Sequence, residues 1–161
     1  YNVDTGNSDL SGETITPDQL ISSVDADQFD AIVLPGGVVN PDKLRMEQDA
    51  IALIRKFNAA GKPVGAVCHG PWLLVEADVL RGRRTTAWYS IRTDLRISGA
   101  TVLDDEVVVD GNLITSRMPS DIPAFNRAII ASLQQGAATH KGRSSSIASQ
   151  SHTHHRIGDQ Q

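Results

Sequence analysis

Residues 63–74 read PVGAVCHGPWLL, and this stretch decides how the centre of the chain folds. A short apolar run ends at Cys68 and His69 and is followed at once by Gly70 and Pro71. Apolar runs that stop at such residues are typical of buried strands in parallel sheets, and proline suits the first turn of a helix. The stretch therefore predicts a buried strand, a sharp turn that carries Cys68, and a helix.

The same alternation of strand and helix continues on both sides of this turn. Residues 29–37, FDAIVLPGG, form an apolar run that stops at proline and glycine, and apolar residues recur at helical spacing over 43–60. Downstream, Asp110 and Gly111 separate two apolar runs, which predicts a hairpin. Further strands and helices are expected at 83–89, 91–97, 100–103 and 120–133. This order predicts an α/β layered fold with a mostly parallel sheet.

Length and composition exclude several classes of protein. With 161 residues the chain has the size of a single domain that can fold without disulfides. Its formal charge of −4 gives no basic face for a phosphate backbone, so we expect no nucleic-acid partner. No apolar run approaches the roughly 20 residues that span a bilayer, so we expect no membrane role. A single cysteine cannot form an internal disulfide, which favours a reducing compartment such as the cytoplasm.

The composition changes towards the C-terminus. We expect residues 1–133 to form the α/β domain and residues 134–161 to be a disordered tail, because the tail has few large apolar side chains to bury. His152, His154 and His155 lie in this tail without a cysteine or carboxylate framework, so a solvated tail is favoured over a metal site. We expect neither a metal nor an organic cofactor.

In α/β sheets, ligands bind at the carboxyl ends of the strands. Cys68 follows one strand and Gly36 and Gly37 follow the strand before it, so the two loops are expected to face each other. The N-terminus of the next helix should favour the Cys68 thiolate, and His69 can act beside it as an imidazolium or as a proton acceptor. This predicts a cysteine nucleophile on a strained turn. A free cysteine that only packs the core is the alternative.

Backbone N–H groups on these two loops could stabilise a negative charge on a substrate. The N–H groups of Gly37 and His69 are the predicted oxyanion hole, since they would converge on the oxygen of an attacked carbonyl group. We place Gly36, Gly70 and Pro71 at the substrate-binding surface. A simple tight turn is the alternative for the double glycine.

Five stretches resemble, in order and spacing, the PfpI family of intracellular cysteine proteases and stress proteins. That family belongs to the class I glutamine amidotransferase-like superfamily, and the resemblance covers about residues 12–133. The stretches are DAIVLPGG, GKPVGAVCHGPWLL, VLRGRR, EVVVDGNLITSRMPSD and IPAFNRAII. The resemblance implies a flavodoxin-like three-layer sandwich, a nucleophilic Cys68 with His69 as its partner, and assembly into dimers or hexamers.

Two positions depart from the pattern that the resemblance implies. Family members carry an acidic residue that reaches the histidine across a subunit interface, and the matching position here is Asp42, one methylene shorter than glutamate. An Asp at this place could instead cap a helix. The family also opens with a strand–helix–strand unit that carries a glutamate beside the sulfur. No segment here matches that unit and Glu13 cannot take the role, so we expect a sheet that is incomplete at its N-terminus, with part of it unpaired.

These observations predict a cysteine-dependent hydrolase that acts on a peptide, an α-oxoaldehyde or a glycated adduct. Cys68 would attack the carbonyl carbon, and His69, oriented by Asp42, would move the proton. The alternatives are a non-enzymatic stress protein that senses oxidants or holds unfolded chains, and an inactive fragment. Trp88 and Tyr89 could line a pocket together with Arg117, although core and surface roles fit their spacing better.

Overall fold

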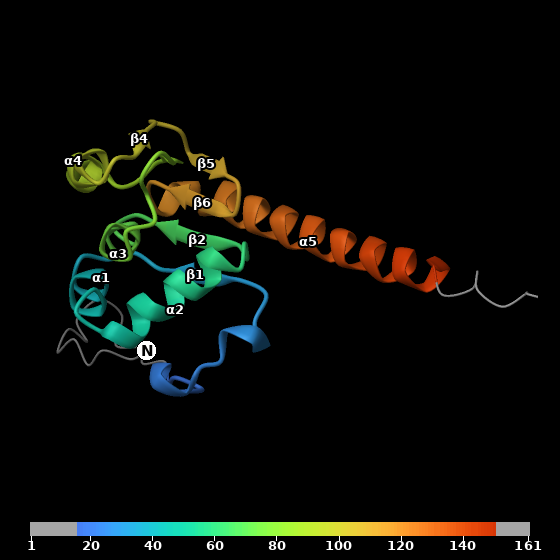
Figure 1. Ribbon diagram of the computed structural model, residues 1–161. Helices are drawn as coiled ribbons and strands as arrows, with labels where there is room; N and C mark the ends of the chain where they lie inside the picture. The colour runs from blue at the N-terminus through green and yellow to red at the C-terminus, as the bar shows by residue number, and fades with distance from the viewer. Residues whose placement is uncertain (1–15, 151–161) are drawn as a thin grey trace, which may run out of the picture.

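The computed structural model describes residues 16–150, with side chains through residue 136 (Figure 1). Fifteen residues at the start and eleven at the end, among them Glu13 and the three tail histidines, lie outside the described residues. The elements are η2 (Ile21–Ser23), η3 (Ala26–Gln28), β1 (Ile32–Leu34), α1 (Val39–Leu44), α2 (Gln48–Ala59), β2 (Val64–Val67), α3 (Trp72–Glu76), β3 (Arg84–Thr85), η4 (Tyr89–Ile91), α4 (Arg92–Ile97), β4 (Thr101–Val102), β5 (Val107–Asp110), β6 (Leu113–Ser116), η5 (Pro119–Asp121) and α5 (Ile122–Gln150).

The main sheet has four strands in the order β1-β2-β6-β5. β2 pairs in parallel with both β1 and β6, and all four of its residues are buried, as the sequence predicts for a central strand. β5 pairs with β6 in an antiparallel hairpin that turns at Gly111, whose φ of +57° lies in the left-handed region. The predicted mostly parallel sheet and its hairpin are both confirmed.

The sheet lies between two helical layers. α2 covers one face, where its Ile54 and Phe57 pack in one cluster with Val64 of β2. α5 covers the other face, where Phe125 packs against Val67 and Ile114. Figure 1 shows α2 on one side of the sheet and α5 running along the other side and beyond it. The flavodoxin-like three-layer sandwich is therefore confirmed.

Gly65 of β2 allows the close approach of α5. A Cβ atom on this residue would lie 2.9 Å from Ile129 Cδ1 and 3.0 Å from Phe125 Cζ. Such contacts are shorter than packed carbon atoms tolerate, so a larger residue would force the Ile129 and Phe125 side chains to shift. The small residue that the sequence places three positions before Cys68 therefore allows α5 to pack closely on this face.

Two elements differ from the prediction. The strand expected at 83–89 is only two residues long, and it pairs with β4 in a separate two-stranded parallel sheet rather than in the main one. The last helix was expected to end near Leu133, but α5 continues to Gln150, into the segment predicted to be disordered. The boundary between domain and tail stays a prediction.

Among the described residues, β1 pairs only with β2 and forms an edge of the main sheet. Val33 of β1 is 49 % exposed. The incompleteness that the sequence predicts for the sheet at its N-terminus stays a prediction. Within residues 16–150, no helix combines the length and apolar character needed to cross a membrane.

Candidate active site

Cys68 lies on a sharp turn between β2 and α3. Its φ is +63°, in the left-handed region that residues with a Cβ rarely adopt. The backbone is held there from two sides, because the Cys68 N–H donates to the Ser116 carbonyl (3.0 Å) and the Cys68 carbonyl accepts from the Trp88 N–H (3.0 Å). The strained turn that the sequence predicts is present, and the cysteine side chain is half-buried.

The loop after β1 lies directly against this turn. A Cβ atom on Gly36 would lie 2.6 Å from Cys68 Cβ and 3.3 Å from its Sγ. A Cβ on Gly70 would lie 2.6 Å from the Leu34 carbonyl oxygen and 2.9 Å from that of Val67. The two loops are therefore in contact through atoms that only glycine leaves room for, as predicted from the shared carboxyl edge of the strands.

The predicted oxyanion-hole donors lie on these same two loops. Gly37 has a φ of +81°, and its N–H and that of His69 have no backbone acceptor within the described part of the chain. Gly70 and Pro71 are buried and shape the turn, whereas Gly36 is half-buried beside the sulfur. Their predicted contacts with a substrate stay predictions.

His69 connects the cysteine to a second segment of the chain. Its Nδ1 lies 3.3 Å from Cys68 Sγ and its Nε2 lies 3.2 Å from Ser90 Oγ. The ring is also flanked by Trp72 (centroids 5.4 Å apart) and Trp88 (6.1 Å). The residue is only 7 % exposed, and burial lowers the pKa of the imidazole below its usual 6.5. At neutral pH the ring is therefore poised to accept a proton.

Sequence reasoning missed Ser90. It follows Trp88 and Tyr89, two residues that the sequence marks only as possible pocket residues, and nothing in a lone serine indicates a histidine partner. The contact depends on the long-range bond between the Trp88 N–H and the Cys68 carbonyl, which brings η4 to the turn.

The two tryptophans that flank His69 are half-buried, and Tyr89 is exposed beside Trp88 (centroids 5.6 Å apart).

Asp42 lies away from this pair in the chain's own contacts. It is an exposed residue inside α1, in the first turn of the helix rather than before it, and the N-cap position belongs to Val38. The capping role that the sequence offers for Asp42 is therefore wrong. Within the described residues, no hydrogen bond or ion pair connects Asp42 to His69, so a contact between them would need a second copy of the chain.

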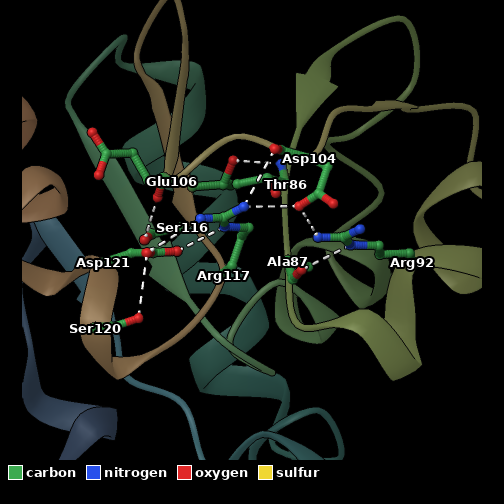
Figure 2. Close-up of polar contacts among 10 residues, drawn as sticks. Thr86, Ala87, Arg92, Asp104, Glu106, Ser116, Arg117, Ser120 and Asp121 are labelled. Atoms are coloured by element: carbon green, nitrogen blue, oxygen red, sulfur yellow. Dashed lines mark hydrogen bonds and ion pairs between the residues drawn. The ribbon is translucent and has the colours of Figure 1, made fainter.

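A network of charged side chains holds the two segments that fix Cys68 (Figure 2). Asp104 accepts from Arg92 Nη2 (2.7 Å) and from Arg117 Nη1 (2.9 Å), and Arg117 Nε also donates to Asp121 (2.8 Å). Arg117 directly follows Ser116, the acceptor of the Cys68 N–H, while Arg92 Nε donates to the carbonyl of Ala87, next to Trp88. Arg117 thus has the surface role that the sequence favours for it.

The pKa values of this network reflect its ion pairs. Hydrogen bonds from Arg92 and then Arg117 lower the pKa of Asp104 from 3.8 to about 2. The hydrogen bonds that Arg117 donates to Asp121 and then to Asp104 raise the pKa of Arg117 further above its usual range. Asp104 is exposed, so solvent weakens these pairs and their contribution to stability is small.

Asp104→Asn should reduce the loss of thermal stability that acid causes between pH 6 and pH 2. Because the pKa of Asp104 is lower in the folded chain than in the unfolded one, its ion pairs stabilise the fold above about pH 4 and are lost as the pH falls towards 2. The melting temperature should therefore fall less in the variant than in the wild type between pH 6 and pH 2. The two falls should differ by a few degrees at most. Asp105→Asn is the matched control and should keep the wild-type slope; equal slopes in all three proteins would contradict the prediction.

Within the part of the chain that the structure describes, no group of three or more His, Cys, Asp or Glu side chains is arranged to hold a metal ion. The polar groups at the turn are the thiol, the imidazole, the Ser90 hydroxyl and backbone N–H groups. Such a set can add a sulfur nucleophile to a carbonyl carbon and move one proton.

A parallel sheet between helices, with a cysteine and its histidine on a left-handed turn at the carboxyl edge, defines a flavodoxin-like α/β protein with a candidate thiol site. The chain belongs to the DJ-1/PfpI family, whose model matches residues 5–132.

Named relatives and a solved structure agree with this assignment. Protein/nucleic acid deglycase 2 of Escherichia coli is 50% identical over 115 residues, which are 71% of this chain and 66% of that protein. General stress protein 18 of Bacillus subtilis is 46% identical over 122 residues, 75% of this chain and 70% of that one. A two-domain protein of Anabaena variabilis, with a DJ-1/ThiJ/PfpI-like and a ferritin-like domain, has a TM-score of 0.69 at 44% identity and covers 71% of this chain. This chain spans only 32% of that two-domain protein, and just under two thirds of the Escherichia coli one.

Proposed function

We propose that the chain is a cysteine-dependent hydrolase of carbonyl substrates, with early glycation adducts as the preferred class. The observation that carries the proposal is the Cys68 Sγ–His69 Nδ1 distance of 3.3 Å on a left-handed turn that faces the Gly36–Gly37 loop. The name of the Escherichia coli relative, a deglycase, favours glycated adducts over unmodified peptides as substrates.

The chemistry follows from the groups at the turn. His69 accepts the thiol proton, and the thiolate adds to the carbonyl carbon while the electron pair of the C=O bond moves to oxygen. The Gly37 and His69 N–H groups then stabilise that oxyanion. In a peptide, the oxyanion then collapses and expels the amine, which takes the proton from His69, and water hydrolyses the acyl–sulfur bond.

In a methylglyoxal adduct, the amine leaves the carbinol carbon with the hydroxyl proton, and the thiolate adds to the aldehyde carbon so formed. A proton then moves from that carbon to the neighbouring ketone carbon, which oxidises the first carbon and reduces the second, and water hydrolyses the resulting lactoyl thioester to lactate and the free thiol. The balance is one adduct and one water to one amine and one lactate.

The test compares three substrates with the purified chain. These are the methylglyoxal adduct of Nα-acetylarginine, free methylglyoxal and a fluorogenic peptide, with lactate, free amine and fluorescence as the readouts. We expect the adduct to be turned over with matched release of amine and lactate. Lactate from free methylglyoxal alone would assign a glyoxalase-like activity, fluorescence alone would assign a peptidase, and no turnover of any substrate would contradict the proposal.

A redox-sensing or chaperone-like stress protein is the second candidate. It is favoured by the partial exposure of the single cysteine and by the name of the Bacillus subtilis relative. Peroxide would oxidise an accessible thiol to sulfenic acid with release of water, and a second peroxide would give sulfinic acid. Oxidation at sub-stoichiometric peroxide, read by intact mass, together with no turnover, would favour this role over the hydrolase.

Three further predictions belong to the hydrolase. Asp42 would reach His69 only from a neighbouring subunit, so its role requires the predicted homo-oligomer, a dimer or hexamer. The substrate is a peptide or a small carbonyl or glycated compound, with no nucleic-acid chain or membrane as a binding partner. The cytoplasm is the predicted location.

A further inference from the structure

His69 has both ring nitrogens engaged within a single chain. Nδ1 faces Cys68 Sγ at 3.3 Å and Nε2 faces Ser90 Oγ at 3.2 Å. We propose that Ser90 is the positioning residue of the site: its hydroxyl accepts from the Nε2–H of His69 and so keeps Nδ1 directed at the sulfur. This inference rests on the proposed function for its biological meaning, but its geometry and its test do not require a substrate.

The proposed direction of the Ser90 bond follows from the task of His69. An imidazole that takes the thiol proton needs a lone pair on Nδ1, and the neutral ring then carries its proton on Nε2. A hydroxyl oxygen can accept from that Nε2–H before the transfer and equally from the imidazolium after it. If Ser90 donated instead, the neutral ring would carry its proton on Nδ1 and could not accept one from the thiol.

Because Ser90 is exposed, accepting from His69 leaves none of its polar atoms without a partner. Ser90 is exposed, so its own O–H can donate to water while its lone pair faces His69. The backbone around it is nevertheless fixed, because the Trp88 N–H donates to the Cys68 carbonyl (3.0 Å) and Ile91 is fully buried in the core. The hydroxyl is therefore held in register with the turn that carries the thiol.

Charged groups surround this trio without contacting the imidazole. On the α1 side Arg45 lies over the Trp72 ring (5.7 Å), and on α4 Asp94 accepts from Trp72 Nε1 (2.7 Å). Arg92 lies over Tyr89 (4.3 Å). Within the described residues no carboxylate hydrogen-bonds to His69, and the partner of Nε2 inside the chain is the Ser90 hydroxyl. The partner that a single chain supplies is therefore uncharged.

The test uses two measurements that need no turnover. The first is the rate at which iodoacetamide alkylates Cys68, the chain's single cysteine, at pH 7. The second is the ¹⁵N spectrum of the His69 ring, which distinguishes a proton on Nε2 from one on Nδ1 and is assigned with the His69→Gln variant. Ser90→Thr and Ser90→Val form the matched pair, since they share their shape and differ only in the hydroxyl. Ser90→Ala is a second variant without a hydroxyl, and Asp42→Asn tests the competing acid.

We expect Ser90→Val and Ser90→Ala to slow alkylation by about three- to tenfold, the range of one lost hydrogen bond, and to mix the two ring tautomers. Ser90→Thr should keep both the wild-type rate and the Nε2–H signal. Equal rates and tautomers in the threonine and valine variants would overturn the inference, as would an Asp42→Asn variant that alone reproduces the loss. If Ser90→Val slowed alkylation and mixed the tautomers in a chain that turns over none of the three substrates, the role of Ser90 would be supported and the proposed hydrolase would be contradicted.

Discussion

Replacing Cys68 by serine should abolish turnover of the glycated adduct, with kcat/KM lower by about 10³-fold or more. A serine hydroxyl fits the same turn and the same approach to His69 Nδ1, but it does not ionise near neutral pH and is the weaker nucleophile there. Steady-state turnover of the methylglyoxal adduct and of the fluorogenic peptide measures the effect. Turnover that survives in Cys68→Ser would remove the thiol from the mechanism.

Cys68→Gly serves as the structural control for this result. The left-handed φ of +63° at residue 68 costs about 1–2 kcal/mol for a residue with a Cβ and almost nothing for glycine. We therefore expect Cys68→Gly to be inactive and yet to melt at a higher temperature than Cys68→Ala. An inactive variant with higher stability would separate the loss of the nucleophile from any loss of the fold.

The sequence predicts the centre of this fold because the relevant signals are local or follow from topology. The apolar run before Cys68 and the proline after it indicate strand, turn and helix without knowledge of the rest of the chain. The meeting of Gly36 with Cys68 follows because parallel neighbours end at one edge of the sheet.

What the sequence could not predict depends on contacts between distant residues. The two residues of β3 show no alternating pattern, and their pairing with β4 is decided by tertiary structure alone. Ser90 reaches His69 only because Trp88 is bonded to Cys68. The extension of α5 to Gln150 was missed for another reason: the Ser- and Gln-rich composition indicates weak burial, which does not exclude a helix.

Gly70→Ala should lower the free energy of unfolding by about 2–4 kcal/mol, the largest loss expected for so small a change in this chain. The added methyl would lie 2.6 Å from the Leu34 carbonyl oxygen and 2.9 Å from that of Val67, and backbone atoms cannot move aside as a flexible side chain can. The two loops that meet at Cys68 would have to separate. Urea unfolding measures the change from the shift in midpoint.

Two other glycines make that result interpretable. Gly136→Ala is the matched control, because a Cβ there would meet no described atom outside its own stretch of α5 within 4 Å and alanine raises helix propensity, so the urea midpoint should stay or rise. A Cβ on Gly36 would lie 2.6 Å from Cys68 Cβ, 3.0 Å from the Val67 carbonyl oxygen and 3.3 Å from Cys68 Sγ, so Gly36→Ala should displace the sulfur and lower alkylation and turnover as well as stability. If Gly70→Ala unfolded at the wild-type midpoint, the contact between the loops would not hold the turn. A lower urea midpoint for Gly70→Ala, together with a folded Gly36→Ala of low reactivity, would assign different roles to the two glycines. Gly70 would permit the contact between the loops, and Gly36 would fix the position of the sulfur.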